Sequence, residues 1–378
     1  MHVGFITPEY PLETLSKSGG LGTSIKNLAT SLSKESVKVT VFVVNQKEDA
    51  ILSDSNVEIH AIKSKKKHFG QWYFNRKQIN AYVQRHLEKT NIDVLEAPDW
   101  TGITAFMKFT VPLVIRLNGS DGYFCHLDGR KQKFKNYIFE KLALKNADCI
   151  VSVSTFTGEL TNEVFNLNRD IITIHNCINV SNFSPLDIQI KKGLILYFGT
   201  LTRKKGVLEL APIFNEVVEQ FEDASLILIG NDNIDNIEKI STLEMMMTAF
   251  SEKARSKVKY LKAVPYDKVK RYISEANVVV LPSFAEAFPM TWLEALAMEK
   301  ALVSSDVGWA KELMVDGKTG FTVDPRDHKT YANRIVSLLL DRQLCKNLGN
   351  AGRQRVIDNF SSEVITKQNM EFYKSLIS

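Results

Sequence analysis

The feature that most constrains the fold is an alternation of short apolar runs with helical patterns, which occurs twice along the chain. The first series begins with the run at residues 3–7. The second begins at residue 194, after a charged stretch, residues 182–192, that has little apolar periodicity. Apolar strands alternating with helices predict mostly parallel sheets covered by helices. We therefore expect two consecutive doubly wound α/β units, whose ligands bind beyond the carboxyl ends of the strands.

Composition limits the class of protein. The chain has 378 residues, 44% of them hydrophobic and 24% charged, which suits two globular domains. Its net charge of +5 fits a polyanionic ligand and does not require nucleic acid. The four cysteines form no Cys-x-x-Cys pair, so neither a zinc site nor a disulfide framework is indicated. No signal peptide and no apolar run of membrane-spanning length is visible, so we expect a cytoplasmic or peripherally bound protein.

A glycine-rich loop follows the first strand. It contains Lys17, Gly19 and Gly20 and leads into a helix. Glycines allow a close approach of the backbone, and the N–H groups at a helix start attract anions. We interpret the loop as a binding site to which Lys17 adds a cation, with a flexible turn as the alternative.

A second loop, residues 199–206, follows the first strand of the second unit. Arg203 and Lys205 lie in it, just before a predicted helix. Arg clamps phosphate oxygens through two N–H groups and Lys acts as a point charge, so this loop is typical of a pyrophosphate cradle. A solvated run of charges is the alternative interpretation.

The third and most informative stretch is residues 282–295. Pro289 can open a helix there, with Glu286 in the loop before it and Glu294 in the helix. One carboxylate can stabilise a reacting sugar and the other can accept hydrogen bonds from ribose hydroxyls. Two surface acids are the alternative. The chain has no Asp-x-Asp triplet, so we expect cations and helix N-termini, rather than a metal, to neutralise phosphates.

These three stretches, in this order, resemble the retaining glycosyltransferases of family 4. The Glu286–Glu294 spacing is similar to the Glu-x7-Glu signature of that family, and residues 176–185 resemble its interdomain segment. The end of the signature is matched by Glu299-Lys300-Ala301-Leu302-Val303, Asp306-Val307-Gly308, Glu312, Asp316-Gly317, Thr319-Gly320 and Pro325. The resemblance implies the α/β fold class GT-B, with two Rossmann-like domains facing a central cleft. It places an acceptor domain at residues 1–180, onto which a helix at about 361–378 packs back, and a donor domain at 181–360.

The resemblance also implies roles for individual residues. Arg203 or Lys204, together with Lys205, would bind the donor pyrophosphate, Glu294 the ribose and Glu286 the transferred sugar. The remaining donor-binding residues would be Lys17, Gly19, Gly20, Lys262, Val264, Phe288, Pro289, Met290 and Thr291. Residues 17–22 are similar to the loop of glycogen and starch synthases that closes over the donor.

The chain departs from the family pattern at three positions. Thr200 stands where the family has Arg, Thr23 where the synthases have Asp, and Asn118 where many members have an active-site His. An amide cannot exchange protons, but it can hydrogen-bond a sugar hydroxyl, so Asn118 is kept with Glu286 as a catalytic candidate. On the acceptor side, Asp121 and Trp100 are candidates, and packing is the alternative for Trp100.

The resemblance implies a metal-independent enzyme without a cofactor, which moves a hexose-type sugar from a UDP- or GDP-sugar to a glycan or lipid-linked acceptor. Bacterial surface polysaccharide or glycoconjugate synthesis is the expected process. A non-catalytic nucleotide-sugar-binding scaffold and a sugar-nucleotide epimerase of the same fold are the alternatives. Basic residues beside aromatic ones suit an anionic membrane surface, such as the inner face of the cell membrane, or a lipid-diphosphate acceptor. A solvated basic face with aromatic residues in the core is the alternative. The residues are Lys63, Lys65, Lys66, Lys67 and His68 before Phe69, Trp72, Tyr73 and Phe74, and Arg130, Lys131, Lys133, Lys135 and Lys141 among Phe134, Tyr137, Ile138 and Leu142.

Overall fold

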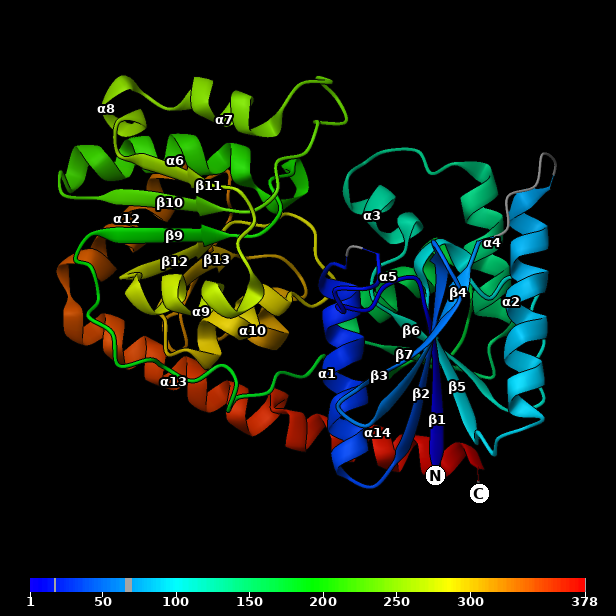
Figure 1. The fold of residues 1–378 in the computed structure, drawn as a ribbon. Coiled ribbons are helices and arrows are strands. Elements are labelled where there is room, and N and C mark those ends of the chain that lie inside the picture. The colour runs from blue at the N-terminus through cyan, green and yellow to red at the C-terminus, as the bar shows by residue number, and fades with distance from the viewer. Residues whose placement is uncertain (17, 65–69, 378) are drawn as a thin grey trace. The chain divides into compact units, whose positions relative to one another are not determined.

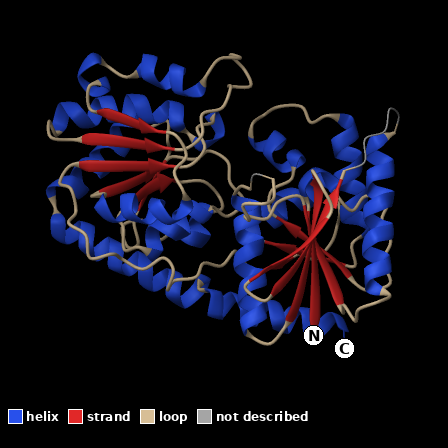
Figure 2. Ribbon diagram, in the orientation of Figure 1, coloured by secondary structure: helices blue, strands red, loops and turns tan. Residues whose placement is uncertain are grey.

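The structure is a computed structural model that describes all residues except 17, 65–69 and 378. The chain divides into two compact units (Figures 1 and 2). The first comprises Met1–Cys177 and Ser361–Ser378, and the second comprises Ile178–Phe360. The chain therefore first passes from one unit to the other after Cys177, three residues before the expected domain boundary at 180.

The first unit is built on an eight-stranded sheet in the order β3-β4-β2-β1-β5-β6-β7-β8. All neighbouring strands are parallel except β3 and β4, which form a hairpin. The strands are β1 His2–Thr7, β2 Lys38–Gln46, β3 Ala50–Asp54, β4 Val57–Lys63, β5 Val94–Pro98, β6 Leu113–Leu117, β7 Cys149–Ser152 and β8 Ile172–Thr173. The helices are α1 Gly20–Lys34, α2 Gln71–Leu87, α3 Asp121–Leu127, α4 Phe134–Asn146, α5 Thr155–Phe165 and α14 Ser362–Ile377, with the 3-10 helix η1 at Trp100–Gly102.

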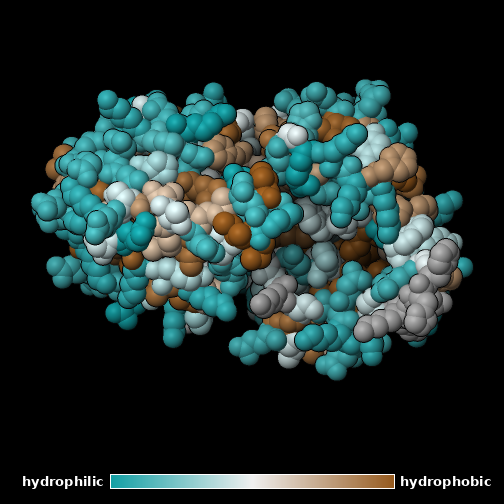
Figure 3. Space-filling view, turned by 90° about the horizontal axis from the view of Figure 1, so that it is seen from above, coloured by the Kyte–Doolittle hydropathy of each residue, from teal (hydrophilic) through white to brown (hydrophobic). Residues whose placement is uncertain are grey.

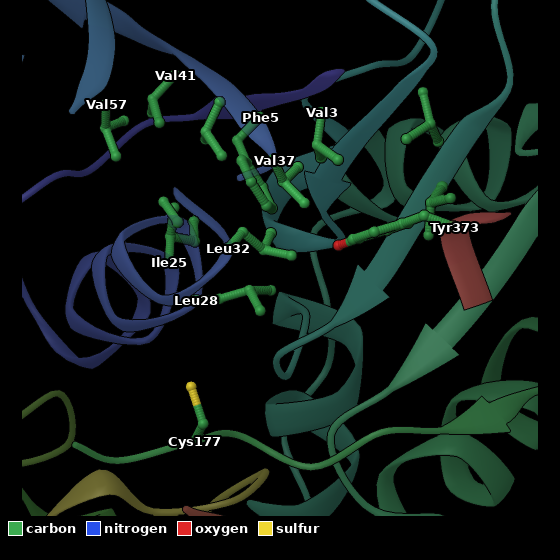
Figure 4. Close-up of a cluster of buried hydrophobic side chains, with 14 of the residues drawn as sticks. Val3, Phe5, Ile25, Leu28, Leu32, Val37, Val41, Val57, Cys177 and Tyr373 are labelled. Carbon is green, nitrogen blue, oxygen red and sulfur yellow. The ribbon is translucent and has the colours of Figure 1, made fainter. Parts of the chain in front are cut away.

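Apolar residues on both faces of this sheet pack against helices. On one face, Ile25, Leu28 and Leu32 of α1 point toward the strand side chains, among them Phe5 (Figure 4). On the other face, residues of α2, α4 and α5 join a second core with the opposite side chains of the same strands. A parallel sheet covered on both faces needs strands that are apolar throughout, which is why the sequence shows continuous apolar runs rather than alternation.

A buried polar network fixes α14 against the sheet of the first unit. Arg116 on β6 forms a two-pronged ion pair with Glu96 on β5, with N–O distances of 2.7 and 3.0 Å. From α14, the Tyr373 hydroxyl donates to Glu96 at 2.7 Å, and Asn369 accepts from Arg116 at 2.5 Å. A buried ion pair is tolerated when further hydrogen bonds satisfy both groups, so the C-terminal helix completes a network that begins in β5 and β6.

The second unit is built on a six-stranded parallel sheet in the order β11-β10-β9-β12-β13-β14. Helices α6 and α12 pack together over the sheet, and α10 packs against α13. The strands are β9 Leu194–Phe198, β10 Ser225–Ile229, β11 Val258–Leu261, β12 Val278–Leu281, β13 Leu302–Ser305 and β14 Phe321–Val323. The helices are η2 Arg203–Lys205 (3-10), α6 Val207–Gln220, α7 Thr242–Ala249, α8 Glu252–Arg255, α9 Tyr266–Glu275, α10 Met290–Ala297, α11 Ala310–Leu313, α12 His328–Leu340 and α13 Arg342–Phe360.

The predicted α/β class is confirmed, two local predictions need correction, and one strand was missed. The glycines at 119 and 122 predict a turn after the strand that ends near residue 117. The segment instead contains the start of α3, because the Ser120 side chain accepts from the Tyr123 N–H and caps a helix there. Apolar spacing in the sequence predicts a helix only from residue 79, whereas α2 begins at Gln71. The prediction missed the first two turns because they are mostly exposed and show no apolar spacing. Strand β3 was not predicted. Ser55 and Asn56, both at positive φ, form the tight turn that pairs it with β4.

The face of the molecule seen in Figure 3 is mostly hydrophilic, with smaller hydrophobic areas. Among the helices of the described residues, we find none with the length and apolar character needed to span a lipid bilayer.

Candidate functional site

The loops that follow β9 and β12 meet at the point where the strand order of the second unit reverses. Such a switch point is where open α/β sheets bind ligands. The backbone N–H groups of Phe284 and Ala285 both donate to the Lys204 carbonyl, at 2.8 and 3.3 Å. Gly206 has a φ of 67°, and a Cβ there would collide with the Pro282 carbonyl. Only glycine therefore allows the two loops to approach this closely.

Lys205 and Glu286 form an ion pair across these two loops. Ser283 donates from its hydroxyl to the same Glu286 oxygen at 3.0 Å, and Glu286 is only 8% exposed. Burial, and after it the charge of Glu286, raises the pKa of Tyr197 well above its usual range. The Tyr197 hydroxyl therefore stays protonated, and it donates to the Thr200 carbonyl at 3.1 Å. The structure thus brings a predicted cation and a predicted acid into direct contact.

Arg203, the other predicted cation, has a carboxylate partner that the sequence analysis did not identify. Its guanidinium donates to both oxygens of Asp235, at 3.0 and 3.1 Å. Asp235 also accepts from the N–H groups of Ile237 and Glu238, at 2.9 Å each. The hydrogen bond from Arg203 is the largest effect on the pKa of Asp235 and, against the effect of burial, holds it well below its usual range. The charge of Arg203 is therefore already compensated within the unit.

Helix α10 begins immediately after the Glu286 loop. Pro289 is its N-cap residue, and its side chain makes no capping hydrogen bond. The first N–H groups of a helix have no intrahelical partner, and the helix dipole makes this end attractive to anions. Phe288 and Met290 are buried on either side of Pro289, Thr291 is half-buried, and Glu294 is buried one turn into the helix. The uncapped end of α10 therefore follows directly on the loop that carries Glu286.

Two further predicted donor residues lie in the loop after β11. Lys262 is exposed and Val264 is half-buried. Strand β11 is separated from β9 by β10, so these residues lie at the same edge of the sheet as Lys205 but two strands away. Their proposed proximity to a nucleobase stays a prediction.

In the first unit, Asn118 follows β6 and is hydrogen-bonded to the buried carboxyl group of Asp99. Its N–H donates to Asp99 at 3.0 Å, and its side-chain amide donates to the Arg116 carbonyl at 3.3 Å. The second oxygen of Asp99 is buried and has no hydrogen-bond partner among the described residues. Burial first, and then the nearby charge of Glu140, raises the pKa of Asp99 to about 8, even though backbone N–H groups oppose this. The Asp99 carboxyl, which accepts a hydrogen bond from the Asn118 N–H, is therefore protonated at neutral pH.

Glu140 on α4 holds the two loops that carry the other acceptor-side candidates. It accepts from the N–H groups of Thr101, Asp121 and Gly122, at 3.0 to 3.1 Å. Trp100, next to Thr101, is 40% exposed. The side chain of Asp121 accepts from Asn136 at 3.0 Å and pairs with Arg130 at 3.5 Å. Glu140 thus links the segments around Trp100 and Asp121, whose contacts with an acceptor stay predictions.

The glycine-rich loop of the first unit already has an anion beside it. The Gly19 N–H donates to the carboxylate of Glu9 at 2.8 Å, and α1 begins at Gly20 without a side-chain cap. An acid of the same unit therefore occupies the position in which the sequence analysis expected a ligand. Lys17, expected beside it, lies outside the described residues.

Comparison with known proteins decides the family. Residues 181–355 match the model described as Glycosyl transferases group 1, and residues 18–182 match the one described as Glycosyltransferase Family 4. This chain belongs to these glycosyltransferases. The alpha-maltose-1-phosphate synthase of Mycolicibacterium smegmatis is 28% identical over 63% of this chain and 65% of its own length, so the chain spans slightly less than two thirds of that relative.

Solved structures of low sequence identity share the fold of this glycosyltransferase. The sucrose-phosphate synthase of Thermosynechococcus elongatus superposes with a TM-score of 0.81 at 18% identity, over 99% of this chain and 98% of the other. Anabaena Alr3699/HepE, solved in complex with UDP-glucose, gives a TM-score of 0.74 at 17% identity over the full length of both chains. The predicted GT-B fold is confirmed.

Sequence reasoning missed four residues that organise the site of this glycosyltransferase. Asp99 directly follows β5, whose apolar run is visible in the sequence, and its place at a strand end was a usable signal. Ser283 lies within the stretch already singled out. Asp235 and Glu140 gave no signal, because an acid in a polar loop or in a helix is normally exposed. Only the tertiary structure shows that both are buried.

Asp99 makes the stability of the first unit depend on pH. Between pH about 4 and 8 the unfolded chain has lost the Asp99 proton and the native unit keeps it, so this contribution to stability declines as pH rises through that window and is gone above it. We expect Asp99→Asn to remove the decline. The difference between the melting temperatures at pH 5.5 and pH 8 should therefore be smaller in this variant than in wild type. Asp128→Asn is the control. If the pH dependence is the same in Asp99→Asn and wild type, Asp99 is ionised at neutral pH.

Proposed function

We propose that this glycosyltransferase moves a hexose-type sugar from a UDP- or GDP-sugar to a glycan or lipid-linked acceptor, with retention of configuration. The single observation that supports this most is the Lys205–Glu286 pair, which lies across two hydrogen-bonded loops next to the uncapped start of α10. A diphosphate needs a cation and N–H donors, and a reacting sugar benefits from a carboxylate. All of these groups come from one edge of one sheet.

Donor binding would use Lys205 as the main cation. Lys205 has one carboxylate partner, Glu286, whereas Arg203 is fixed by both oxygens of Asp235. The β-phosphate would lie at the start of α10, where the N–H groups of the first turn have no intrahelical partner. Glu294, one turn farther along, would accept from the ribose hydroxyls. The complex of Anabaena Alr3699/HepE with UDP-glucose supports a nucleotide-sugar donor, because that protein shares the fold.

Transfer with retention would proceed by attack on the same face as the departing group. The bond from the anomeric carbon to the diphosphate oxygen breaks, and a bond from the acceptor oxygen to that carbon forms. The acceptor's hydroxyl proton passes to the leaving diphosphate. Lys205 and the start of α10 would stabilise the negative charge on the leaving group, and Glu286 would stabilise positive charge on the sugar. Each of these groups is already placed by hydrogen bonds, which lowers the cost of reorganisation.

The acceptor would bind to the first unit, at the loops held by Asp99 and Glu140. Asn118 would hydrogen-bond a sugar hydroxyl through its amide, and Trp100 offers an exposed aromatic face to a sugar ring. Surface polysaccharide or glycoconjugate synthesis is the process that suits a glycan or lipid-linked acceptor. The proposal requires no metal ion and no cofactor. A cytoplasmic location stays a prediction.

Two substitutions separate chemistry from donor binding. Glu286→Ala should reduce transfer at least about a thousandfold while UDP-sugar still raises the melting temperature, because the sugar loses its carboxylate and the diphosphate keeps its N–H donors. Glu294→Ala should abolish the melting shift, since ligand-induced stability follows binding by mass action. Glu216→Ala removes an exposed acid of α6 and is the matched control.

Other outcomes would support the alternatives. A protein that binds donor but shows no transfer, whatever residue is at 286, would be a binding scaffold. A product formed from donor alone, without an acceptor, would indicate an epimerase. A Glu286→Ala variant with full transfer activity would contradict the proposed role of that carboxylate.

We also propose that an aromatic and basic patch of the first unit contacts an anionic membrane. Trp72, Tyr73 and Phe106 form a chain of ring contacts and are each 39 to 44% exposed. Lys135 lies 5.4 Å above the Trp72 ring. Phe106 has a φ of 66°, an unusual conformation for a bulky residue, and is the most exposed of the three. Residues 65–69 of the predicted basic stretch lie outside the described residues.

Vesicle binding tests the patch. The Trp72→Ser and Phe106→Ser double variant should lose most co-sedimentation with vesicles of phosphatidylglycerol and phosphatidylcholine, because aromatic anchors supply apolar contact in the interface. Ile51→Ser, which removes an exposed apolar residue of β3, should bind as wild type. Equal binding of wild type to pure phosphatidylcholine vesicles, or unchanged binding of the double variant, would contradict this role.

A further inference from the structure

Two histidines and a glutamate of the first unit form a cluster that has no part in the proposed transfer reaction. Glu58 and His60 are on β4, and His86 is in the last turn of α2. One potential metal-ligating atom of each lies within 4.8 Å of the others. Glu58 is at the amino end of its strand, whereas Asn118 and Asp99 follow the carboxyl ends of parallel strands. The cluster therefore lies toward the opposite edge of the sheet.

The geometry of the pair on β4 follows from strand alternation. Residues two apart in a strand point to the same face, so Glu58 and His60 lie side by side and face α2. The Nε2 atom of His60 lies 2.8 Å from Glu58, and its Nδ1 atom lies 2.8 Å from the Tyr82 hydroxyl. A metal-bound histidine usually has its second nitrogen held by a hydrogen bond, which fixes the ring. Tyr82 does this for His60.

The ring of His86 packs edge-on against that of His60, with 4.5 Å between centroids. Its Nε2 atom is buried and has no hydrogen-bond partner among the described residues. A buried nitrogen without a partner is energetically costly, and native proteins seldom leave one unexplained. A ligand between His86 and the pair on β4 would satisfy this atom.

We propose that Glu58, His60 and His86 bind one zinc ion. Two imidazole nitrogens and a carboxylate oxygen are a ligand set that zinc accepts, and a water would complete a tetrahedron. With metal–ligand distances of about 2.0–2.2 Å, ligand atoms lie about 3.3 Å apart. The His60 Nε2 atom and the Glu58 oxygen, which are 2.8 Å apart, would therefore separate slightly on binding, and the three ligand atoms already lie within 4.8 Å of one another. The Glu58 side chain is 38% exposed, which gives the ion a path from solvent. The site stabilises the packing of α2 on β4 and is independent of sugar transfer.

A substitution of Lys38 tests the proposal in the opposite direction, because it should strengthen zinc binding rather than weaken it. It is exposed on the neighbouring strand β2 and acts electrostatically on both Glu58 and His86. A nearby positive charge weakens the binding of a cation. Lys38→Gln should therefore bind zinc several-fold more tightly than wild type.

The test is zinc binding to the full chain after removal of metal with a chelator. Titration against a chromophoric competitor should show one zinc ion per chain, and a cobalt-loaded sample should show the visible absorption of a tetrahedral site. His86→Gln and Glu58→Gln should each weaken zinc binding at least tenfold. His328→Gln is the matched control, because it removes another histidine that contacts a carboxylate, Glu209, at 2.6 Å.

Two results would overturn the proposal. One is the absence of zinc binding by the wild-type chain, and the other is equal binding by wild type, His86→Gln and Glu58→Gln, which would mean an adventitious ion only. Melting curves without metal show that each variant is folded, and two ligand variants keep the test decisive if one fails to fold. Because the readout is binding rather than transfer, its outcome is separate from that of the proposed function.

Discussion

The proposed donor site depends on the hydrogen bonds that join the loop after β9 to the loop after β12. The Lys204 carbonyl accepts from two successive N–H groups of the second loop, and Gly206 gives the space for this approach. These backbone contacts join the loop that carries Lys205 to the loop that carries Glu286, and α10 follows the second loop. Without them, the cation and the carboxylate would lie on separate surface loops and could not act on one substrate.

In each of the three loops singled out in the sequence, a carboxylate of the same unit takes part in an ion pair or a hydrogen bond. Lys205 pairs with Glu286, Arg203 pairs with Asp235, and the Gly19 N–H binds Glu9. A half-buried charge without a partner is costly, so these internal acids stabilise the glycosyltransferase in the absence of a ligand. A diphosphate would compete with them for the same donors. Because Asp235 also accepts two backbone N–H groups, Arg203 is the hardest of these cations to release.

The sequence predicted the fold well because parallel sheets buried on both faces leave a strong pattern. Continuous apolar runs, such as Leu194–Phe198, marked the central strands. Two features of the fold could not be predicted from the sequence pattern. Strand β3 is half-exposed and depends on a tight turn at Ser55 and Asn56, and α2 begins in a segment whose residues are mostly exposed. Local periodicity gives no signal in either case.

For the site, the sequence identified the residues whose position after a strand is visible, such as Lys205 and Glu286. It did not identify Asp235 or Glu140, because their function as hydrogen-bond acceptors depends on segments distant in the sequence. It also assigned Arg203 and Lys205 equal roles. Their different partners, which only the structure shows, separate them.

The central claim is that Lys205 supplies the main positive charge for the donor diphosphate, and calorimetric titration with UDP tests it most directly. A charge-assisted hydrogen bond contributes about 1.5–3 kcal/mol, so Lys205→Gln should bind UDP at least about tenfold more weakly than wild type. Lys253→Gln, a surface lysine paired with Glu219, should bind as wild type. Unchanged UDP affinity in Lys205→Gln, together with a large loss in Arg203→Gln, would contradict the account.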